Sequence, residues 1–317
     1  MDEFKTVIAA LNDDQTIKSR SLIRLLFDFL EDVENDDPDL NDLVKFLHNT
    51  VDRGNQREKE ICKKAIAHLN EIDISEYVEY LDEIESDGIR FLPFYSVVYP
   101  QQLWKIEDPP FGLYIDGSTS ALFGGIAIVG TREAKSHRKE YIRSLAGKLA
   151  EEGYPIVSGL ASGIDTAAHE GAIEADGQTT AVLPGGIQTI RPASNKELGE
   201  KIPGSGALVA EVSDKERIHR GRFVERNRIT SGLSISVIIG ASGETGGTIR
   251  QAEFAQEQCR PRYLYDPENG DGQSPKKLDE LGFNRFSSTD ELLEMLDSDW
   301  REPSTGPGFQ QEFTDFS

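Results

Sequence analysis

Arginine side chains gather in one short segment of this chain. Residues 216–229, ERIHRGRFVERNRI, hold five arginines against two glutamates. A guanidinium group offers a planar fork of N–H donors that matches phosphate oxygens, so the segment indicates an anion-binding surface. Phe223 lies inside it and has two interpretations: a platform on which a nucleobase stacks, or a core residue of the helix expected here.

Three glycine-rich turns predict a second kind of anion site. Each follows a short apolar run, and the sequences are IAIVGTRE at 126–133, PIVSGLASGID at 155–165 and TTAVLPGG at 179–186. A strand that ends in glycine and leads into a helix leaves backbone N–H groups accessible at the helix start, where the helix dipole also favours anions. We expect parallel strands to place these turns along one edge of a sheet. A fourth turn, SGETGGTIRQA at 242–252, has the same form.

Two sets of residues near these turns have alternative interpretations. Asp165 and His169 stand four residues apart, which suits either an acid–base pair or a packed, hydrogen-bonded pair on one helix face. Ser136 is a candidate N-cap between basic neighbours, and this helix start either binds an anion or is simply solvated. The sequence holds no GxSxG or Walker motif and its five histidines are scattered. We therefore expect no enzymatic activity, no metal and no cofactor.

The acidic charge of the chain is unevenly distributed. The net charge is −22 over 317 residues, with −14 in residues 1–120, zero in 121–260 and −8 in 261–317. The glycine-rich middle is thus compatible with binding a polyanion, although the total charge is unfavourable for it. We find no apolar run of about 18 residues, no signal peptide and only two distant cysteines. These features predict a cytoplasmic protein that does not enter a membrane.

The order of predicted elements divides the chain into three regions. Residues 1–88 repeat apolar residues at helical spacing and predict a small all-α domain. Residues 89–266 alternate short apolar runs with helical segments, which predicts an α/β domain with a Rossmann-like, mostly parallel sheet and helices on both faces. Residues 267–317 predict an acidic tail with one short helix at 289–298 and disorder at 301–317.

Eleven elements are predicted within the α/β region. The expected strands are 126–129, 155–157, 180–183, 207–211, 236–239 and 262–265. The expected helices are 136–151, 164–175, 195–201, 222–231 and 247–258.

Taken in order, these motifs resemble the DprA/Smf family of DNA-processing proteins. The resemblance covers about residues 99–266 and is carried by YPQQLWKIEDPPFGLYIDG, IAIVGTRE, IVSGLASGIDTAAHEGAI, VLPGG, PASNKEL and FVERNRITSGLS. Two segments depart from the family pattern: Arg191-Pro192 stands where Tyr-Pro is usual, and TGGTIRQA replaces a turn like SGSLITA. The acidic tail is also unlike the winged-helix module found in many members.

The resemblance implies a protein that binds single-stranded DNA and loads a RecA-type recombinase during DNA uptake or recombination. A homodimer is expected on the same ground. The residues expected to bind DNA or phosphate are Gly130, Arg132, Ser158, Gly159, Gly163, Asp165, Lys196, Arg226, Asn227, Arg228, Gly246, Gly247 and Arg250. The alternative is a sensor of small nucleotides or a nucleotide phosphoribohydrolase similar to the LOG enzymes, because PGGIQT at 184–189 is a broken version of their PGGxGT turn.

Overall fold

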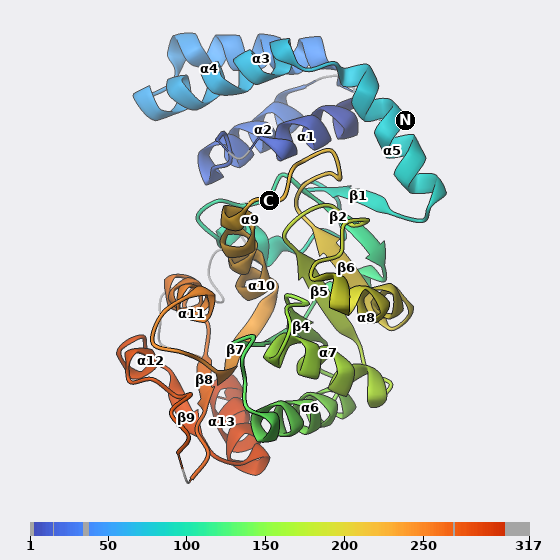
Figure 1. Ribbon diagram of the computed structural model, residues 1–317. Coiled ribbons are helices and arrows are strands. Elements are labelled where there is room, and N and C mark those ends of the chain that lie inside the picture. Colours follow the sequence, from blue (N-terminus) through green and yellow to red (C-terminus); the bar gives the residue numbers. More distant parts are fainter. Residues whose placement is uncertain (1–2, 15, 34–37, 269, 302–317) are drawn as a thin grey trace.

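Short apolar runs form a single sheet in the computed structural model, which describes residues 3–14, 16–33, 38–268 and 270–301. The nine strands lie in the order β1-β2-β6-β5-β4-β3-β7-β8-β9 (Figure 1). β1 and β2 are antiparallel at one edge, and the other seven strands are parallel to one another. The strands are β1 (Arg90–Pro93), β2 (Gly112–Gly117), β3 (Gly125–Gly130), β4 (Ile156–Ser158), β5 (Thr179–Leu183), β6 (Gly206–Ala210), β7 (Ser234–Ala241), β8 (Arg262–Tyr265) and β9 (Asn284–Phe286).

Alternating side chains of the central strands build a core on each face of the sheet. In β3, Ile126 and Ile128 belong to one apolar cluster, which includes buried residues of α6, α7 and α13. Ala127 and Val129 belong to another cluster, together with buried residues of α11. Because successive side chains of a strand point to opposite faces, helices must cover both. The predicted Rossmann-like α/β fold is therefore confirmed. The helices of this part are α6 (Ser136–Glu151), α7 (Ile164–Glu174), α8 (Lys196–Lys201), α9 (Arg220–Glu225), α10 (Asn227–Gly232), α11 (Gly247–Glu257), α12 (Lys277–Glu280) and α13 (Thr289–Arg301).

The N-terminal helices pack against the antiparallel edge of the sheet (Figure 1). One apolar cluster contains Phe4 and Leu26 of the helices together with Leu113 and Tyr114 of β2. The rings of Phe27 and Trp104 also meet, 5.1 Å apart and edge to face. Burial of these side chains makes the helices and the sheet share one continuous core. These helices are α1 (Glu3–Asp13), α2 (Arg20–Asp32), α3 (Leu40–Arg53), α4 (Gln56–Glu71) and α5 (Ile74–Ser86).

Several local features differ from the sequence predictions, which did not include β1, β2 or α12. The helix expected at 222–231 is two helices, α9 and α10, which meet at Arg226. The expectation that Ser136 caps its helix is wrong, because Lys135 occupies the N-cap position and makes no side-chain cap. The sheet also continues past residue 266, since β9 pairs with β8. The disorder expected at 301–317 falls, from residue 302 onward, outside the described residues.

Candidate nucleic-acid interface

The carboxyl ends of the parallel strands meet at one edge of the sheet. β3, β4, β5 and β7 each lead there into one of the four glycine-rich turns, and β6 leads into the segment that contains the arginine cluster. Such an edge is the usual ligand site of an open α/β sheet. The side chains that enter each turn decide whether the turn can bind an external anion.

The carboxylate of Asp165 occupies the turn after β4. It accepts hydrogen bonds from the backbone N–H groups of Gly130 at 3.3 Å, Gly159 at 3.2 Å and Ala161 at 3.4 Å. Asp165 is buried, and its burial raises its pKa, while the nearby Arg226 and the three N–H groups oppose that rise. The backbone N–H groups that the sequence predicted to bind phosphate are thus bonded to a carboxylate of this protein.

Arg226 is buried behind the same turn. Its guanidinium donates to the carbonyl oxygen of Gly159 at 2.9 Å and lies 4.0 Å from the carboxylate of Asp165. A Cβ atom on Gly159 would lie 1.5 Å from the Arg226 Nη1 atom, so a larger residue there would have to displace the guanidinium from its present position. The structure therefore brings Gly159, Asp165 and Arg226 together, inside the molecule.

The helix that follows holds His169 in a packed environment. The ring Nδ1 lies 2.7 Å from the hydroxyl oxygen of Thr179, and the residue is fully buried. Burial, with a contribution from the positive charge of Arg226, lowers the pKa of His169 to about 3. The imidazole is thus neutral at physiological pH. His169 is packed as one interpretation expected, but its hydrogen bond is to Thr179, while Asp165 bonds the turn.

An aspartate from a distant loop neutralises the helix start after β3. Arg138 donates to both carboxylate oxygens of Asp271, at 2.7 and 2.6 Å, and to the carbonyl oxygens of Gly240 and Tyr265. His137 also contacts Asp271, at 2.9 Å. The hydrogen bond from Arg138 is the main reason that the pKa of Asp271 lies far below its usual value. This basic helix start binds an anion, and the anion is a side chain of the same protein.

A third aspartate fills the turn after β5. Asp214 accepts hydrogen bonds from the backbone N–H of Gln188 at 3.1 Å and from the hydroxyl group of Thr189 at 3.0 Å. A Cβ atom on Gly186 would lie 2.3 Å from the Asp214 carboxyl carbon. Carboxylates of the chain therefore bond backbone N–H groups at or beside all three glycine turns of the 126–186 segment: Asp165 at the first and second turns, and Asp214 beside the third.

The fourth glycine turn is open to solvent. Gly246 is the N-cap of α11 with a φ of 110°, and a Cβ atom on Gly246 or Gly247 would meet no atom within 4 Å. Asn227 donates to the carbonyl oxygen of Gly247 at 3.3 Å, which ties α10 to this turn. Arg250 is engaged along α11, where it bonds Glu253 at 3.0 Å and lies over the ring of Phe254.

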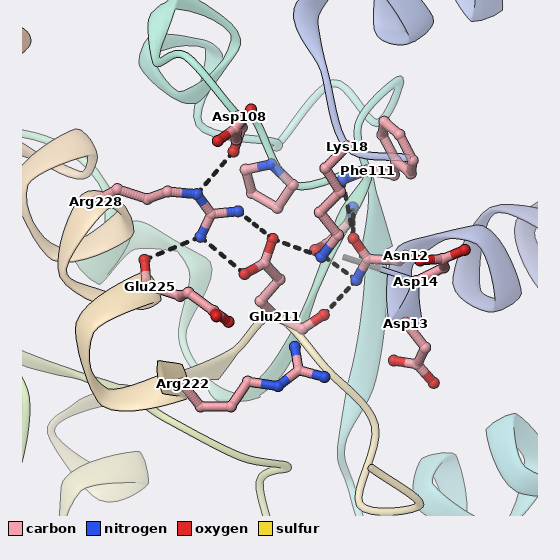
Figure 2. A network of polar contacts seen from close by, with 12 residues as sticks. Asn12, Asp13, Asp14, Lys18, Asp108, Phe111, Glu211, Arg222, Glu225 and Arg228 are labelled. Carbon is pink, nitrogen blue, oxygen red and sulfur yellow. Dashed lines mark hydrogen bonds and ion pairs between the residues drawn. The ribbon is translucent and has the colours of Figure 1, made fainter. Parts of the chain in front are cut away.

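Arg228 lies in a buried ionic network around Glu211, the residue that follows β6 (Figure 2). It binds both carboxylate oxygens of Glu211 and donates to the carbonyl oxygen of Asp108 at 2.8 Å. Lys18, which follows α1, reaches the same carboxylate at 2.6 Å. Asn12 completes the link by bonding the backbone of Phe111 at 2.9 Å and the carbonyl oxygen of Glu211. The network joins the N-terminal helices to the arginine cluster.

Charges in this network strongly perturb one another. Burial favours the neutral form of Glu211, but Arg228 and Lys18 outweigh that effect and lower its pKa to about 2. Burial, aided by the charge of Arg228, lowers the pKa of Lys18 to about 8 despite the attraction of Glu211. The carboxylate is thus ionised at neutral pH and holds two cations in the interior.

An open cavity of about 570 Å³ lies beside the filled turns. The Arg132 guanidinium is 5.6 Å from the centre of the Phe223 ring, a cation–π distance. Arg132, Arg191 and Arg217 are exposed and Phe223 is half-buried. Sequence reasoning identified Arg132 as a site residue but not Arg191 or Arg217, whose proximity follows from the path of the loops after β5 and β6. The cavity is lined by Arg132, Ser162, Thr189, Arg191, Pro192, Glu216, Arg217, Ile218 and Phe223.

Three further predicted site residues are not among those that line this cavity. Lys196 is exposed at the start of α8 and lies 3.7 Å from Glu200. Gly163, with a φ of 89°, supports the turn, since a Cβ atom there would meet the backbone oxygens of Thr131 and Arg132. Ser158 is buried and donates to the carbonyl oxygen of Ile128 at 2.6 Å.

Two negative observations hold for the described ranges. No three His, Cys, Asp or Glu side chains gather there in a way that suits a metal ion. None of the helices in those ranges combines the length and the apolar character needed to span a bilayer.

The fold and this edge define a Rossmann-like α/β protein with exposed arginine side chains around a cavity at the carboxyl edge of its sheet. A family model described as DNA recombination-mediator protein A matches residues 90–297. DNA processing protein DprA of Bacillus subtilis is 36% identical over 242 residues, which cover 74% of this chain and 80% of that protein. Protein Smf of Synechocystis is 35% identical over 184 residues, which cover 56% of this chain and 46% of that protein. The chain belongs to the DprA/Smf family of DNA-processing, recombination-mediator proteins.

Two solved structures are similar to this one. DprA from Streptococcus pneumoniae superposes with a TM-score of 0.72 and 24% identity, over 92% of this chain and 96% of that chain. DNA processing protein A from Helicobacter pylori gives a TM-score of 0.59 and 28% identity, over 66% of this chain and 96% of that chain. The H. pylori structure was described for the single-stranded DNA binding mode of that protein.

Proposed function

We propose that this protein binds single-stranded DNA across the carboxyl edge of its sheet and acts there as a recombination mediator without catalysis. The observation that carries the proposal is the open cavity, which three exposed arginines line together with Phe223, and where the Arg132 guanidinium lies over the Phe223 ring. Single strands bind to positive grooves that follow the phosphate backbone, and aromatic rings stack on their bases. The described binding mode of the H. pylori relative supports the same ligand.

The filled glycine turns favour a polymer over a mononucleotide. A nucleotide-binding turn presents free N–H groups to phosphate, whereas Asp165 already accepts from Gly130 and Gly159 in the first two turns, and Asp214 accepts from Gln188 beside the third. Side chains on the rim remain as phosphate ligands, and these are spread along the edge. We therefore rank the small-nucleotide sensor and the LOG-like hydrolase below DNA binding.

The predicted site residues have two roles in this proposal. Arg132 and Lys196 contact the backbone of the strand, and Gly246, Gly247 and Arg250 extend its path towards α11. The buried and half-buried members shape the edge from behind: Gly130, Ser158, Gly159, Gly163, Asp165, Arg226, Asn227 and Arg228.

Anisotropy titrations with labelled oligo-dT at several salt concentrations test the proposal. Each phosphate contact on a single strand contributes about −0.7 to the slope of log K against log salt. Arg132→Ala and Arg217→Ala should each weaken binding and make the slope shallower by roughly that amount. Lys148→Ala is the matched control, since Lys148 lies on α6 and pairs with Glu152 at 3.2 Å. Unchanged affinity and slope in both arginine variants would refute the assignment.

We further propose that the bound protein helps to load a RecA-type recombinase during DNA uptake, and that it acts as a homodimer. Family membership supports both statements. Recombinase filament formation on oligo-dT coated with single-strand binding protein tests the loading. The native protein should shorten the lag of filament formation, and the Arg132→Ala variant should leave the lag as long as it is without the protein. Light scattering tests the dimer, and a monomeric mass at working concentration contradicts it.

A further inference from the structure

The arginine-lined cavity contains one acidic side chain. Glu216 is the single carboxylate among the described residues that line it, next to the guanidinium groups of Arg132, Arg191 and Arg217. A carboxylate repels the phosphates of a DNA strand, so Glu216 reduces the electrostatic attraction between the cavity and the DNA backbone. Its useful contact with a bound strand is therefore with a base.

Glu216 is held in place by a buried arginine. Its Oε2 atom accepts a hydrogen bond from Arg222 at 2.9 Å, and the Arg222 side chain is only 7% exposed. The backbone N–H of Glu216 also bonds the carbonyl oxygen of Ser213 at 3.2 Å. A carboxylate has about four acceptor positions, so this tethered group keeps capacity for a further donor. It loses little conformational entropy when it meets one.

Base edges differ in what they present to a carboxylate. Cytosine carries an exocyclic N4 amino group, from which carboxylates accept hydrogen bonds in nucleic-acid complexes. Adenine carries a comparable N6 amino group. Thymine presents the O4 carbonyl oxygen at the corresponding position, which a carboxylate repels. Single strands expose these edges because their bases are unpaired.

We propose that Glu216 is a specificity-determining residue, which makes the cavity prefer amino-bearing bases over thymine. The Phe223 ring with Arg132 above it provides the flat surface on which the base stacks, and Glu216 reads its edge. This inference rests on the proposed single-strand binding and adds base selectivity to it.

The test compares oligo-dC with oligo-dT of equal length at mildly alkaline pH, where cytosine is unprotonated. For one accepted hydrogen bond to a charged group we expect the native chain to bind oligo-dC about tenfold more tightly or better. Glu216→Gln should bring the ratio of the two affinities close to one, because an amide both donates and accepts. Near-ultraviolet circular dichroism checks that this isosteric variant retains the native fold.

Glu133→Gln is the matched control. Glu133 is exposed next to Arg132 but does not line the cavity, so this variant changes the charge equally without touching a base. It should raise the affinity for both oligonucleotides alike and leave their ratio unchanged. Tight binding with no preference in the native chain, or a preference that survives Glu216→Gln, overturns the specificity role alone. Failure of both oligonucleotides to bind overturns the proposed function and this inference with it.

Discussion

Replacing Glu211 with glutamine should strongly destabilise the fold. The variant keeps the volume of the side chain but leaves two buried cations, Lys18 and Arg228, without their carboxylate. Removal of one partner from a buried ion pair costs about 3–5 kcal/mol of unfolding free energy. The pKa of Glu211 gives an independent value. A decrease from 4.5 to about 2 corresponds to about 3 kcal/mol, at about 1.4 kcal/mol per pKa unit.

Urea unfolding followed by far-ultraviolet circular dichroism measures this loss. Glu197→Gln is the control, because Glu197 is an exposed partner of Lys201 at 2.7 Å and its removal should not shift the midpoint measurably. An unchanged midpoint for Glu211→Gln refutes the reasoning, since it would mean that the network does not stabilise the link between the N-terminal helices and the sheet.

The same network predicts how stability depends on pH. The folded-state pKa of Glu211 is depressed, so its stabilisation is complete above pH 4.5 and is lost as the pH falls towards about 2. The depressed pKa of Lys18 affects the free energy of unfolding at alkaline pH. Between pH 8 and 10.5 the folded state releases the lysine proton first, so this residue makes stability rise with pH. Lys18→Met should abolish that rise, and a persistent rise of equal size contradicts the assignment.

Two further predictions concern the filled turns. Gly159→Ala should destabilise the fold, because the new Cβ atom would collide with Arg226, whereas Gly247→Ala in the open turn should be nearly neutral. Thermal unfolding of the two variants compares them directly, and equal melting temperatures contradict the packing argument. Asp271→Asn should lower the melting temperature, because it leaves the buried charge of Arg138 uncompensated. An unchanged melting temperature for this variant would show that Arg138 does not need the carboxylate.

Most of the α/β fold could be predicted from the sequence because its signals are local. Short apolar runs that end in glycine marked β3, β4 and β5, and helical spacing marked α6, α7 and α11. β9 was missed because Asn284, Arg285 and Phe286 form a short strand with a charged residue in it, and only pairing with β8 identifies it. The paired backbone, rather than the residue pattern, defines such a strand.

The direction of the charged side chains could not be predicted, because their partners are distant in sequence. In the sequence Arg228 has the pattern of a surface ligand, whereas in the structure it binds the buried Glu211, which also binds Lys18. Lys18 is 193 residues from Glu211 in the sequence. Arg138 likewise depends on Asp271, 133 residues away. A run of arginines indicates a binding surface, but only the positions of the buried carboxylates show which arginines remain free.

The aspartates in the glycine turns also make these turns independent of the surrounding solution. Asp165 at the first two turns and Asp214 beside the third are part of the chain, so each is present there at the high effective concentration of an intramolecular group. Free phosphate or a nucleotide would have to displace a tethered competitor at each turn. Variation in dissolved phosphate or nucleotide should therefore leave these three turns unchanged, and competition by such anions should be confined to the exposed arginines on the rim.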